Sequence, residues 1–292
     1  MGEFSAAWLH LREPVDAASR ARHLARATGE ALGHAAWVHV LDLGAGTGSN
    51  TRYLAGYLPR RQRWILADAD AALLGQVGDE MYRWATGCGY TATFTPEGLE
   101  VSHGAHQWDI RTRLGSLAAL DDEELFAGQH LVTASALLDL VSRHWVEALA
   151  VRCHAQGALV HMALSYDGRI ECSPADPDDG LVRTLVNEHQ VTDKGFGPAL
   201  GPSAASETAR SLERLAYRVE RHQSDWLLGP CDREMQEALV QGWASAAASI
   251  APEHAGSIEA WATRRQRVIE AGTSSLVVGH EDLLAHPPRP PR

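Results

Sequence analysis

The apolar residues of this chain recur with two spacings that predict alternating helices and strands. From Glu13 to Leu32 they lie three and four residues apart, as on one face of a helix, and Gly33 follows as a helix end. Apolar runs then alternate with helical patterns, giving strands at 37–43, 63–67, 99–107, 130–134 and 158–165 and helices at 49–58, 71–86 and 142–155. The alternation predicts an α/β fold: a doubly wound, mostly parallel sheet with helices on both faces.

The pattern changes after Ser165. Residues 167–205 are rich in Asp, Pro and Gly around one helical stretch at 180–189, which predicts an inserted lid, or substrate loop, after the fifth strand. A helix at 206–216, a strand at 217–226, two helices within 231–272 broken near Pro252, and a strand at 274–279 follow. The predicted sheet therefore has seven strands, with a helical insertion before the last one.

These elements divide the chain into five predicted segments. An N-terminal helical segment at 1–34 precedes a doubly wound core at 35–165 and a lid insertion at 166–205. The rest of the sheet with its helical cap follows at 206–284. A proline-rich tail at 285–292 is expected to be disordered, because proline cannot join a helix or an inner strand.

Composition narrows the classes of function. Of the 292 residues, 45% are apolar and 22% are charged, as in ordinary globular proteins, which excludes a wholly disordered chain. The formal net charge of −11 disfavours an extended nucleic-acid footprint, so DNA is not an expected partner. Nearly all the positive charge is arginine, and Lys194 is the only lysine.

The cysteines predict neither a metal site nor disulfides. Cys88, Cys153, Cys172 and Cys231 are widely spaced and form no zinc-type cluster, so they are interpreted as reduced thiols of a cytoplasmic protein. No apolar run approaches the ~20 residues of a membrane-spanning helix, and 1–10 lacks the pattern of a secretory signal. We expect no metal, no membrane and no export; the oligomeric state stays open between monomer and homodimer.

The most informative stretch joins the first predicted strand to its helix. It reads Asp42-Leu43-Gly44-Ala45-Gly46-Thr47-Gly48-Ser49-Asn50, and its glycines permit a tight turn on which a ligand can lie against the backbone. A nicotinamide dinucleotide fingerprint would read GxGxxG. Here the glycines alternate and an acidic residue stands two places before the first, so the loop predicts a nucleoside-bearing ligand of another kind.

This arrangement resembles motif I of the class I, Rossmann-like S-adenosylmethionine-dependent methyltransferases, and three further motifs extend the resemblance over about 35–165. Asp68, at the end of the second strand, matches the carboxylate that binds both ribose hydroxyls. Gln107-Trp108-Asp109-Ile110 looks like the element that contacts adenine, and Thr133 to Asp139 matches the loop beside the methionine moiety. The resemblance implies S-adenosylmethionine as cofactor, S-adenosylhomocysteine as product, and a cofactor site made of Asp42, Gly44, Ala45, Gly46, Gly48, Asn50, Asp68, Ala69, Asp109, Ile110 and Ser135.

The sequence offers fewer candidates for residues that bind or activate the methyl acceptor than for residues that bind the cofactor. Methyl transfer is an in-line displacement that depends mainly on positioning, and a base is needed only for an acceptor proton of high pKa. Histidine suits that task near neutrality, so the predicted catalytic residues are His189 and His144, with Asp139 orienting or charge-pairing the substrate. The predicted substrate contacts are Arg12, Trp145, Asn187, Asp193 and Lys194.

The acceptor is expected to be a small molecule, methylated on oxygen, nitrogen or carbon. Ser135-Ala136-Leu137-Leu138 departs from the Asp/Asn-Pro-Pro-aromatic loop of enzymes that methylate amino groups of nucleic acids, and Pro230-Cys231 lies in the wrong element for a cytosine-C5 nucleophile. Two alternatives stay open. One is an RNA or protein methyltransferase on the same fold, which should show a basic open groove. The other is a nucleotide-cofactor-binding protein without catalysis, or a dehydrogenase.

Overall fold

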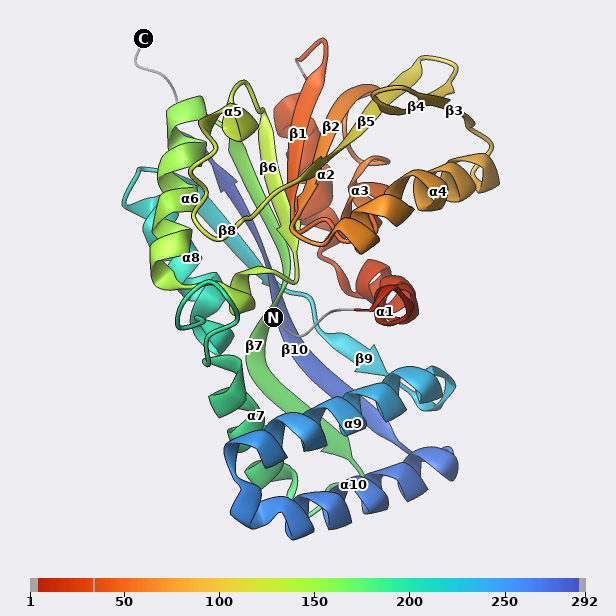
Figure 1. Cartoon of the computed structure of the whole chain (residues 1–292), viewed down its shortest axis with the longest axis vertical. Helices are drawn as coiled ribbons and strands as arrows, with labels where there is room; N and C mark the ends of the chain where they lie inside the picture. Colours follow the sequence, from red (N-terminus) through yellow and green to blue (C-terminus); the bar gives the residue numbers. More distant parts are fainter. Residues whose placement is uncertain (1–4, 34, 289–292) are drawn as a thin grey trace.

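The computed structural model describes residues 5–33 and 35–288, and one mixed sheet runs through that part of the chain (Figure 1). Its ten strands are ordered β3-β4-β5-β2-β1-β6-β7-β10-β8, with β9 paired to β10. Five neighbouring strands are parallel: β5 (His106–Leu114), β2 (Arg61–Asp68), β1 (Val38–Leu43), β6 (Leu131–Ser135) and β7 (Leu159–Ser173). The predicted α/β class and doubly wound core are confirmed, and the strand order reverses between β1 and β6.

The remaining five strands pair antiparallel, so the predicted seven-stranded, mostly parallel sheet was wrong: the sheet of the described residues has ten strands and is mixed. β10 (Ser275–His286) runs between β7 and β8 (Arg218–Gln223), and β9 (Trp226–Leu228) pairs with its other end. β3 (Thr91–Thr95) and β4 (Gly98–His103) form hairpins with each other and with β5. The single strand predicted at 99–107 is therefore parts of two strands, because the chain reverses at Gly104, whose φ of 58° suits glycine.

Helices cover both faces of the parallel strands. The side chains of β1 point alternately to the two faces and show which helices pack on each. Val38 and Val40 pack against α2 (Arg22–Leu32), α3 (Ser49–Leu54) and α4 (Ala71–Gly87). Leu41 and Leu43 pack on the opposite face, against α5 (Glu123–Phe126), α6 (Arg143–Gln156) and α8 (Ala204–Glu213). Side chains alternate in this way because successive residues of a strand point to opposite faces.

The long strands β7 and β10 extend beyond the parallel strands. Their extension and the helices packed on it form a part of the molecule that we call the cap. The far halves of β7 and β10 pair with each other and pack against α7 (Asp179–Gln190), α9 (Arg233–Ile250) and α10 (Ala255–Glu270). Figure 1 shows these three helices in the lower part of the view, with α5 and the β3–β4 hairpin in the upper part. The break predicted near Pro252 separates α9 from α10, with a short 3₁₀ turn at Pro252–His254.

Several predicted boundaries need correction. Residues 166–173 continue β7, so the first part of the expected lid loop is a paired strand. The single helix predicted at 13–32 is two helices, α1 (Ala6–Ser19) and α2, separated by extended backbone at Arg20. Positions 285 and 286 belong to β10, so the tail is shorter than predicted, and 1–4, 34 and 289–292 lie outside the described residues.

The bend that directs β7 into the cap is held by Asp282. Leu164 adopts a left-handed φ of 54°, and β10 has register irregularities on either side of the facing segment. The fully buried Asp282 accepts the backbone N–H of Leu164 through Oδ1 and that of Ala21 through Oδ2, both at 2.8 Å. The carboxylate thus joins β7, β10 and the start of α2 at one point.

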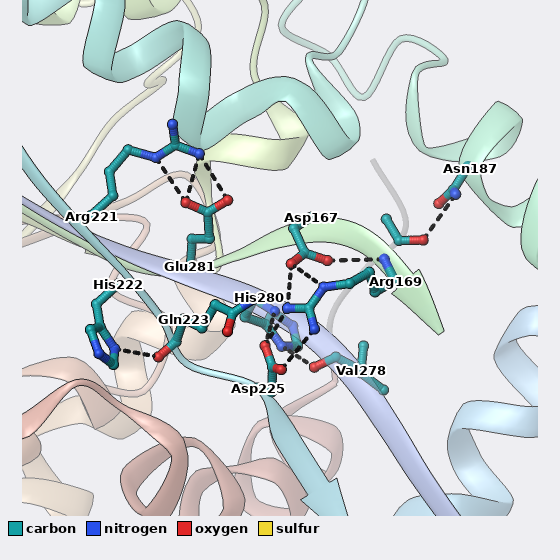
Figure 2. A network of polar contacts seen from close by, with 11 residues as sticks. Asp167, Arg169, Asn187, Arg221, His222, Gln223, Asp225, Val278, His280 and Glu281 are labelled. Carbon is teal, nitrogen blue, oxygen red and sulfur yellow. Dashed lines mark hydrogen bonds and ion pairs between the residues drawn. The ribbon is translucent and has the colours of Figure 1, made fainter. Parts of the chain in front are cut away.

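A second polar cluster fixes the ribbon just beyond the bend. The Arg169 guanidinium on β7 lies between the carboxylates of Asp167 and Asp225, with shortest distances of 2.6 Å to each (Figure 2). The backbone N–H of His280 also donates to Asp225 at 3.2 Å. Gly279 is pressed against this cluster, because a Cβ there would lie 2.1 Å from Oδ1 of Asp167 and 2.8 Å from Cβ of Arg169.

We therefore expect Gly279→Ala to lower the free energy of unfolding by about 1–3 kcal/mol, the usual cost of overpacking. Asp167 cannot rotate away cheaply, since it accepts hydrogen bonds from the Arg169 backbone and side chain. Urea denaturation measures the change. Gly75→Ala, at an exposed helical position of α4 with no heavy atom within 4 Å of the new Cβ, is the matched control and should stabilise by up to about 1 kcal/mol. Equal effects of the two substitutions would contradict the close approach.

Candidate functional site

The glycine-rich loop lies where the strand order reverses, at the carboxyl ends of β1 and β2. Gly44 and Gly46 have φ values of 64° and 54°, a region that side chains with a Cβ rarely adopt. The N–H of Gly44 donates to the carbonyl of Ala67 at 2.9 Å, and the N–H of Gly46 donates to Asp68 Oδ2 at 2.8 Å. In open α/β sheets ligands bind in the crevice at such a point.

The acidic residue before the glycines supports the loop from beneath. Asp42 is fully buried; Asn50 Nδ2 donates to its Oδ1 at 2.7 Å and Thr51 to its Oδ2 at 3.1 Å. Asn50 Oδ1 accepts a 2.7 Å bond from the buried Arg20. Burial raises the pKa of the Asp42 carboxyl to about 7, although the two hydrogen bonds act the other way. Asp42, predicted as part of the cofactor site, therefore lies beneath the loop and outside the lining of the cavity beside it, and the Asn50 amide is bonded to Asp42 and Arg20.

A cavity beside this loop, which we call the loop cavity, combines apolar walls with a few polar groups. Its polar members include Asp68, Asp70, Ser135 and Asp16. Asp70 is occupied, since it caps α4 by accepting the N–H groups of Ala72 and Leu73. The remaining walls are the glycine loop and the apolar side chains of Leu9, Leu73, Leu117, Leu137, Leu140 and Phe196. The structure thus places the predicted Gly44, Ala45, Gly46, Asn50, Asp68, Ala69 and Ser135 around one cavity; Gly48, the N-cap of α3, lies outside its lining.

Asp68 keeps capacity for a ligand. Its Oδ1 accepts the N–H of Asp70 at 2.9 Å, and its Oδ2 accepts that of Gly46. A carboxylate offers about four acceptor sites, so each oxygen has another one available. The geometry suits a pair of neighbouring hydroxyl groups approaching from the cavity.

The predicted adenine contact was misplaced. Asp109 pairs in register with Arg63 in the middle of β5 and ion-pairs with it at 3.3 Å, and Ile110 is buried in the core. Five residues separate Asp109 from the carboxyl end of β5 at Leu114, about 16 Å along a strand. The segment that does reach the loop cavity is the one after β5, through Leu117.

A second cavity, the cap cavity, lies between the cap helices and the sheet. Four aromatic side chains line it, Trp8, Tyr166, Trp226 and Trp243, from α1, β7, β9 and α9. Its polar lining includes Asp139, His189, Lys194 and His280. Arg12, Ala136 and Leu140 line both cavities, so the two meet at these residues.

Arg12 lies at this junction, as a substrate contact should. Its guanidinium forms an ion pair with Asp16, with Nε 2.8 Å from Oδ2, and stands 5.1 Å from the ring centroid of Trp226. The indole N–H of Trp226 donates to Asp16 as well, at 3.0 Å. Burial raises the pKa of Asp16, and Arg12 opposes that effect. The three side chains hold α1 against β9.

Of the other residues predicted to contact or activate the acceptor, some line the cap cavity and some do not. His189 and Lys194 line the cap cavity, and Lys194 Nζ donates to the His189 carbonyl at 3.0 Å and to Thr192 Oγ1 at 2.8 Å. Burial, and secondarily Lys194, lowers the pKa of His189, so its imidazole is neutral at pH 7. Asp139 also lines this cavity.

Four predicted residues lie outside both cavities. His144 is exposed on α6, while Trp145 is buried and donates its indole N–H to the Leu117 carbonyl at 2.6 Å. Asn187 accepts from the Tyr166 hydroxyl at 2.8 Å, and Asp193 accepts backbone N–H groups of its own turn. Trp145 and Asn187 therefore contact residues that line the cavities, whereas His144 and Asp193 line neither cavity.

His280 is a member of the site that no sequence pattern indicated. It is 5% exposed and lines the cap cavity from β10, with its ring 4.5 Å from that of Trp226. Its Nδ1 is 3.0 Å from the Val278 carbonyl, so Nδ1 carries the proton and Nε2 holds a lone pair (Figure 2). Burial lowers the pKa of His280 to about 3. Only the β7–β10 pairing brings it beside Tyr166.

The residues that the structure describes contain no group of three or more His, Cys, Asp or Glu side chains placed to hold a metal ion. Within the same residues no helix is long and apolar enough to cross a membrane.

No protein-family model matches the chain, and no curated protein matches it either. The solved structures that the chain is similar to include a putative methyltransferase from Bacillus halodurans C-125, with 12% identity and a TM-score of 0.48 over 92% of this chain and 100% of that one.

Two further matches are SAM-dependent methyltransferases in complex with S-adenosylhomocysteine. The one from Thiobacillus denitrificans is 14% identical, with a TM-score of 0.43 over 97% of this chain and 99% of its own. The one from Geobacter sulfurreducens is 14% identical, with a TM-score of 0.42 over 91% of both chains. These values describe distant similarity.

The buried histidines predict how stability depends on pH. Burial lowers the pKa of His161, on β7, to about 3 from the ordinary 6.5, and Thr28 Oγ1 lies 2.8 Å from its Nδ1. Between these two values the unfolded chain binds a proton that the folded protein does not, so this contribution to stability is complete above pH 6.5 and lost as the pH falls towards 3. The raised pKa of Asp42 has the opposite effect on the pH dependence of stability. The contribution of His161 is therefore measured by comparing variants with the wild type.

We expect His161→Gln to lose less stability than the wild type between about pH 7.5 and about pH 5, a range in which the buried histidine stays neutral. Urea denaturation at both values measures the difference, and His10→Gln, on the exposed side of α1, is the control and should behave as the wild type does. An unchanged pH response in His161→Gln would contradict a neutral, buried His161.

Proposed function

We propose that the chain is an S-adenosylmethionine-dependent methyltransferase that acts on a small-molecule acceptor. The observation that carries the proposal is the pair of joined cavities: one at the glycine loop and Asp68, the other enclosed by cap helices, with Arg12, Ala136 and Leu140 between them. Methyl transfer needs two ligands held end to end in a site that excludes water. The joined cavities provide that arrangement.

The residues of the loop cavity fit the cofactor. Asp68 has acceptor sites left for both ribose hydroxyls, and Leu73 and Leu117 offer apolar walls for a purine ring. Gly46 packs closely against this wall, because a Cβ there would lie 3.0 Å from a methyl carbon of Leu9. Bound there, the cofactor supplies a methyl group on a positively charged sulfur.

The chain's own residues then position the acceptor. Arg12, at the junction, is held in one orientation by Asp16 and Trp226, so it can orient a polar group of either ligand. The aromatic walls of the cap cavity exclude water from the acceptor. Asp139, His189 and His280 are groups there that can hold a proton, and the two imidazoles are neutral at pH 7 because burial lowers their pKa values.

An acceptor site lined by helices of the cap favours a small molecule over a macromolecule. The cap cavity lies under α7 and α9, and the chain carries a net charge of −11, whereas an RNA methyltransferase needs an open basic groove beside the cofactor. We therefore prefer a small-molecule acceptor, with methylation on oxygen, nitrogen or carbon.

Cofactor binding tests this function directly. In isothermal titration with S-adenosylhomocysteine, we expect Asp68→Ala to weaken binding about tenfold to a hundredfold, because a bidentate contact to a carboxylate contributes ~1.5–3 kcal/mol. Asp109→Ala is the matched control: it removes a carboxylate of the neighbouring strand that lies outside the loop cavity, and its affinity should stay unchanged. Failure of the wild type to bind S-adenosylhomocysteine, or equal affinity in Asp68→Ala, would rule the proposal out.

A further inference from the structure

One carboxylate in the cap cavity lacks a partner that its burial demands. Asp139, in the short 3₁₀ turn after β6, is 7% exposed, and its Oδ1 has no hydrogen-bond partner within the described residues. A buried charged oxygen without a partner is costly. Burial raises the pKa of Asp139 to about 6, while hydrogen bonding to its own backbone N–H, the charge of Arg12 and hydrogen bonding to the Tyr166 backbone N–H act in the opposite direction. The carboxylate is therefore kept ready to accept a proton or a hydrogen bond from something in the cavity.

Four neighbouring side chains already use hydrogen-bond donors on other partners. Arg12 is paired with Asp16, the Tyr166 hydroxyl donates to Asn187, and Nδ1 of His280 donates to Val278. Lys194, which could attract an acidic ligand, already donates to two oxygen atoms, the His189 carbonyl and Thr192 Oγ1. The unmet requirement in the cap cavity is thus for a donor or a cation beside Asp139.

The aromatic walls of the cap cavity indicate the chemistry of the rest of the ligand that would bind there. Trp226 and Tyr166 have their polar atoms bonded to Asp16 and Asn187, so towards the cavity they offer apolar ring surface. Ring faces attract cations as well as apolar groups. The cavity therefore matches a molecule with an apolar, ring-sized body and one cationic group.

We propose that the acceptor is a primary or secondary amine on an apolar body, and that Asp139 binds the ammonium group and takes its proton. The inference rests on the proposed function and narrows its substrate class. Ala136 and Leu140, on either side of Asp139 in the sequence, line both cavities, so an amine held by Asp139 lies near the junction. Asp139 is then the base that sequence reasoning assigned to His189 or His144.

The proton and electron balance is complete with the groups named. The ammonium gives one proton to the Asp139 carboxylate and becomes a neutral amine with a lone pair. That lone pair forms the new carbon–nitrogen bond while the bond between the methyl carbon and the donor sulfur breaks, its electrons staying on sulfur. The product leaves as a methylated ammonium, and Asp139 returns its proton to water.

Binding measurements test the proposal without turnover. They use two sets of three probes of similar shape, an amine, an alcohol and an acid in each set. With S-adenosylhomocysteine present, isothermal titration compares 2-phenylethylamine, 2-phenylethanol and 3-phenylpropionate, and a second set compares tryptamine, tryptophol and indole-3-propionate. We expect at least one set to show the amine binding tenfold or more tightly than its alcohol and acid. In Asp139→Asn that preference should disappear, while affinity for S-adenosylhomocysteine stays within twofold of wild type.

Glu188→Gln is the matched control, because it removes a carboxylate on α7 outside the lining of the cap cavity. It should keep the amine preference. Three outcomes overturn the inference: no amine preference in either set, a preference that persists in Asp139→Asn, or tighter binding of the acid that is lost in Lys194→Met. Each can occur with normal binding of S-adenosylhomocysteine, so this failure is distinct from failure of the proposed function.

Discussion

The position of the cap relative to the sheet depends on the hydrogen bonds of one buried carboxylate, Asp282. Two backbone N–H groups from distant parts of the chain, those of Ala21 and Leu164, converge on its two oxygens. A fully buried carboxylate is tolerated only when such donors and a nearby cation compensate it, and the buried guanidinium of Arg20 is that cation. Because Leu164 is where β7 leaves the parallel sheet, the same contacts set the direction of the ribbon that carries the cap.

The N-terminal helices connect the two cavities. Arg20, between α1 and α2, donates to Asn50 and so reaches the support of the glycine loop, whereas Arg12 and Asp16, on α1, hold Trp226 at the wall of the cap cavity. A short stretch of the same segment thus contributes to both sites. Removing this segment would leave the buried Asn50 and Asp282 with missing partners, even though every strand of the sheet would still be present.

The sequence predicted the features of the fold that depend on residues close together along the chain. Alternating glycines after a short apolar strand, followed by a carboxylate at the end of the next strand, were sufficient to locate Gly44, Gly46 and Asp68 around one cavity. Asp109 was misplaced because the turn at Gly104 divides the expected strand into β4 and the start of β5, and β5 continues to Leu114. A hairpin is difficult to separate from a single interrupted strand when the sequence is read without its pairing.

The cap could not be predicted in the same way. Asp139, Tyr166, Trp226 and His280 meet because β7 and β10 pair over lengths well beyond the apolar runs that mark them as strands. His144 and His189 were equally plausible from residue type and segment, and only the exposure of the first turn of α6 separates them. Burial and orientation of a polar side chain result from non-local packing, which periodicity does not encode.

The route of the chain through the cap has an evolutionary consequence. Residues 229–274, which contain α9 and α10, leave after β9 and return at β10, and the two flanking positions Leu228 and Leu276 are paired in the sheet. An excursion that starts and ends at neighbouring strands can be lengthened, shortened or replaced without moving the glycine loop or Asp68. This helical pair is therefore a unit that sequence change can rebuild while the glycine loop and Asp68 keep their positions.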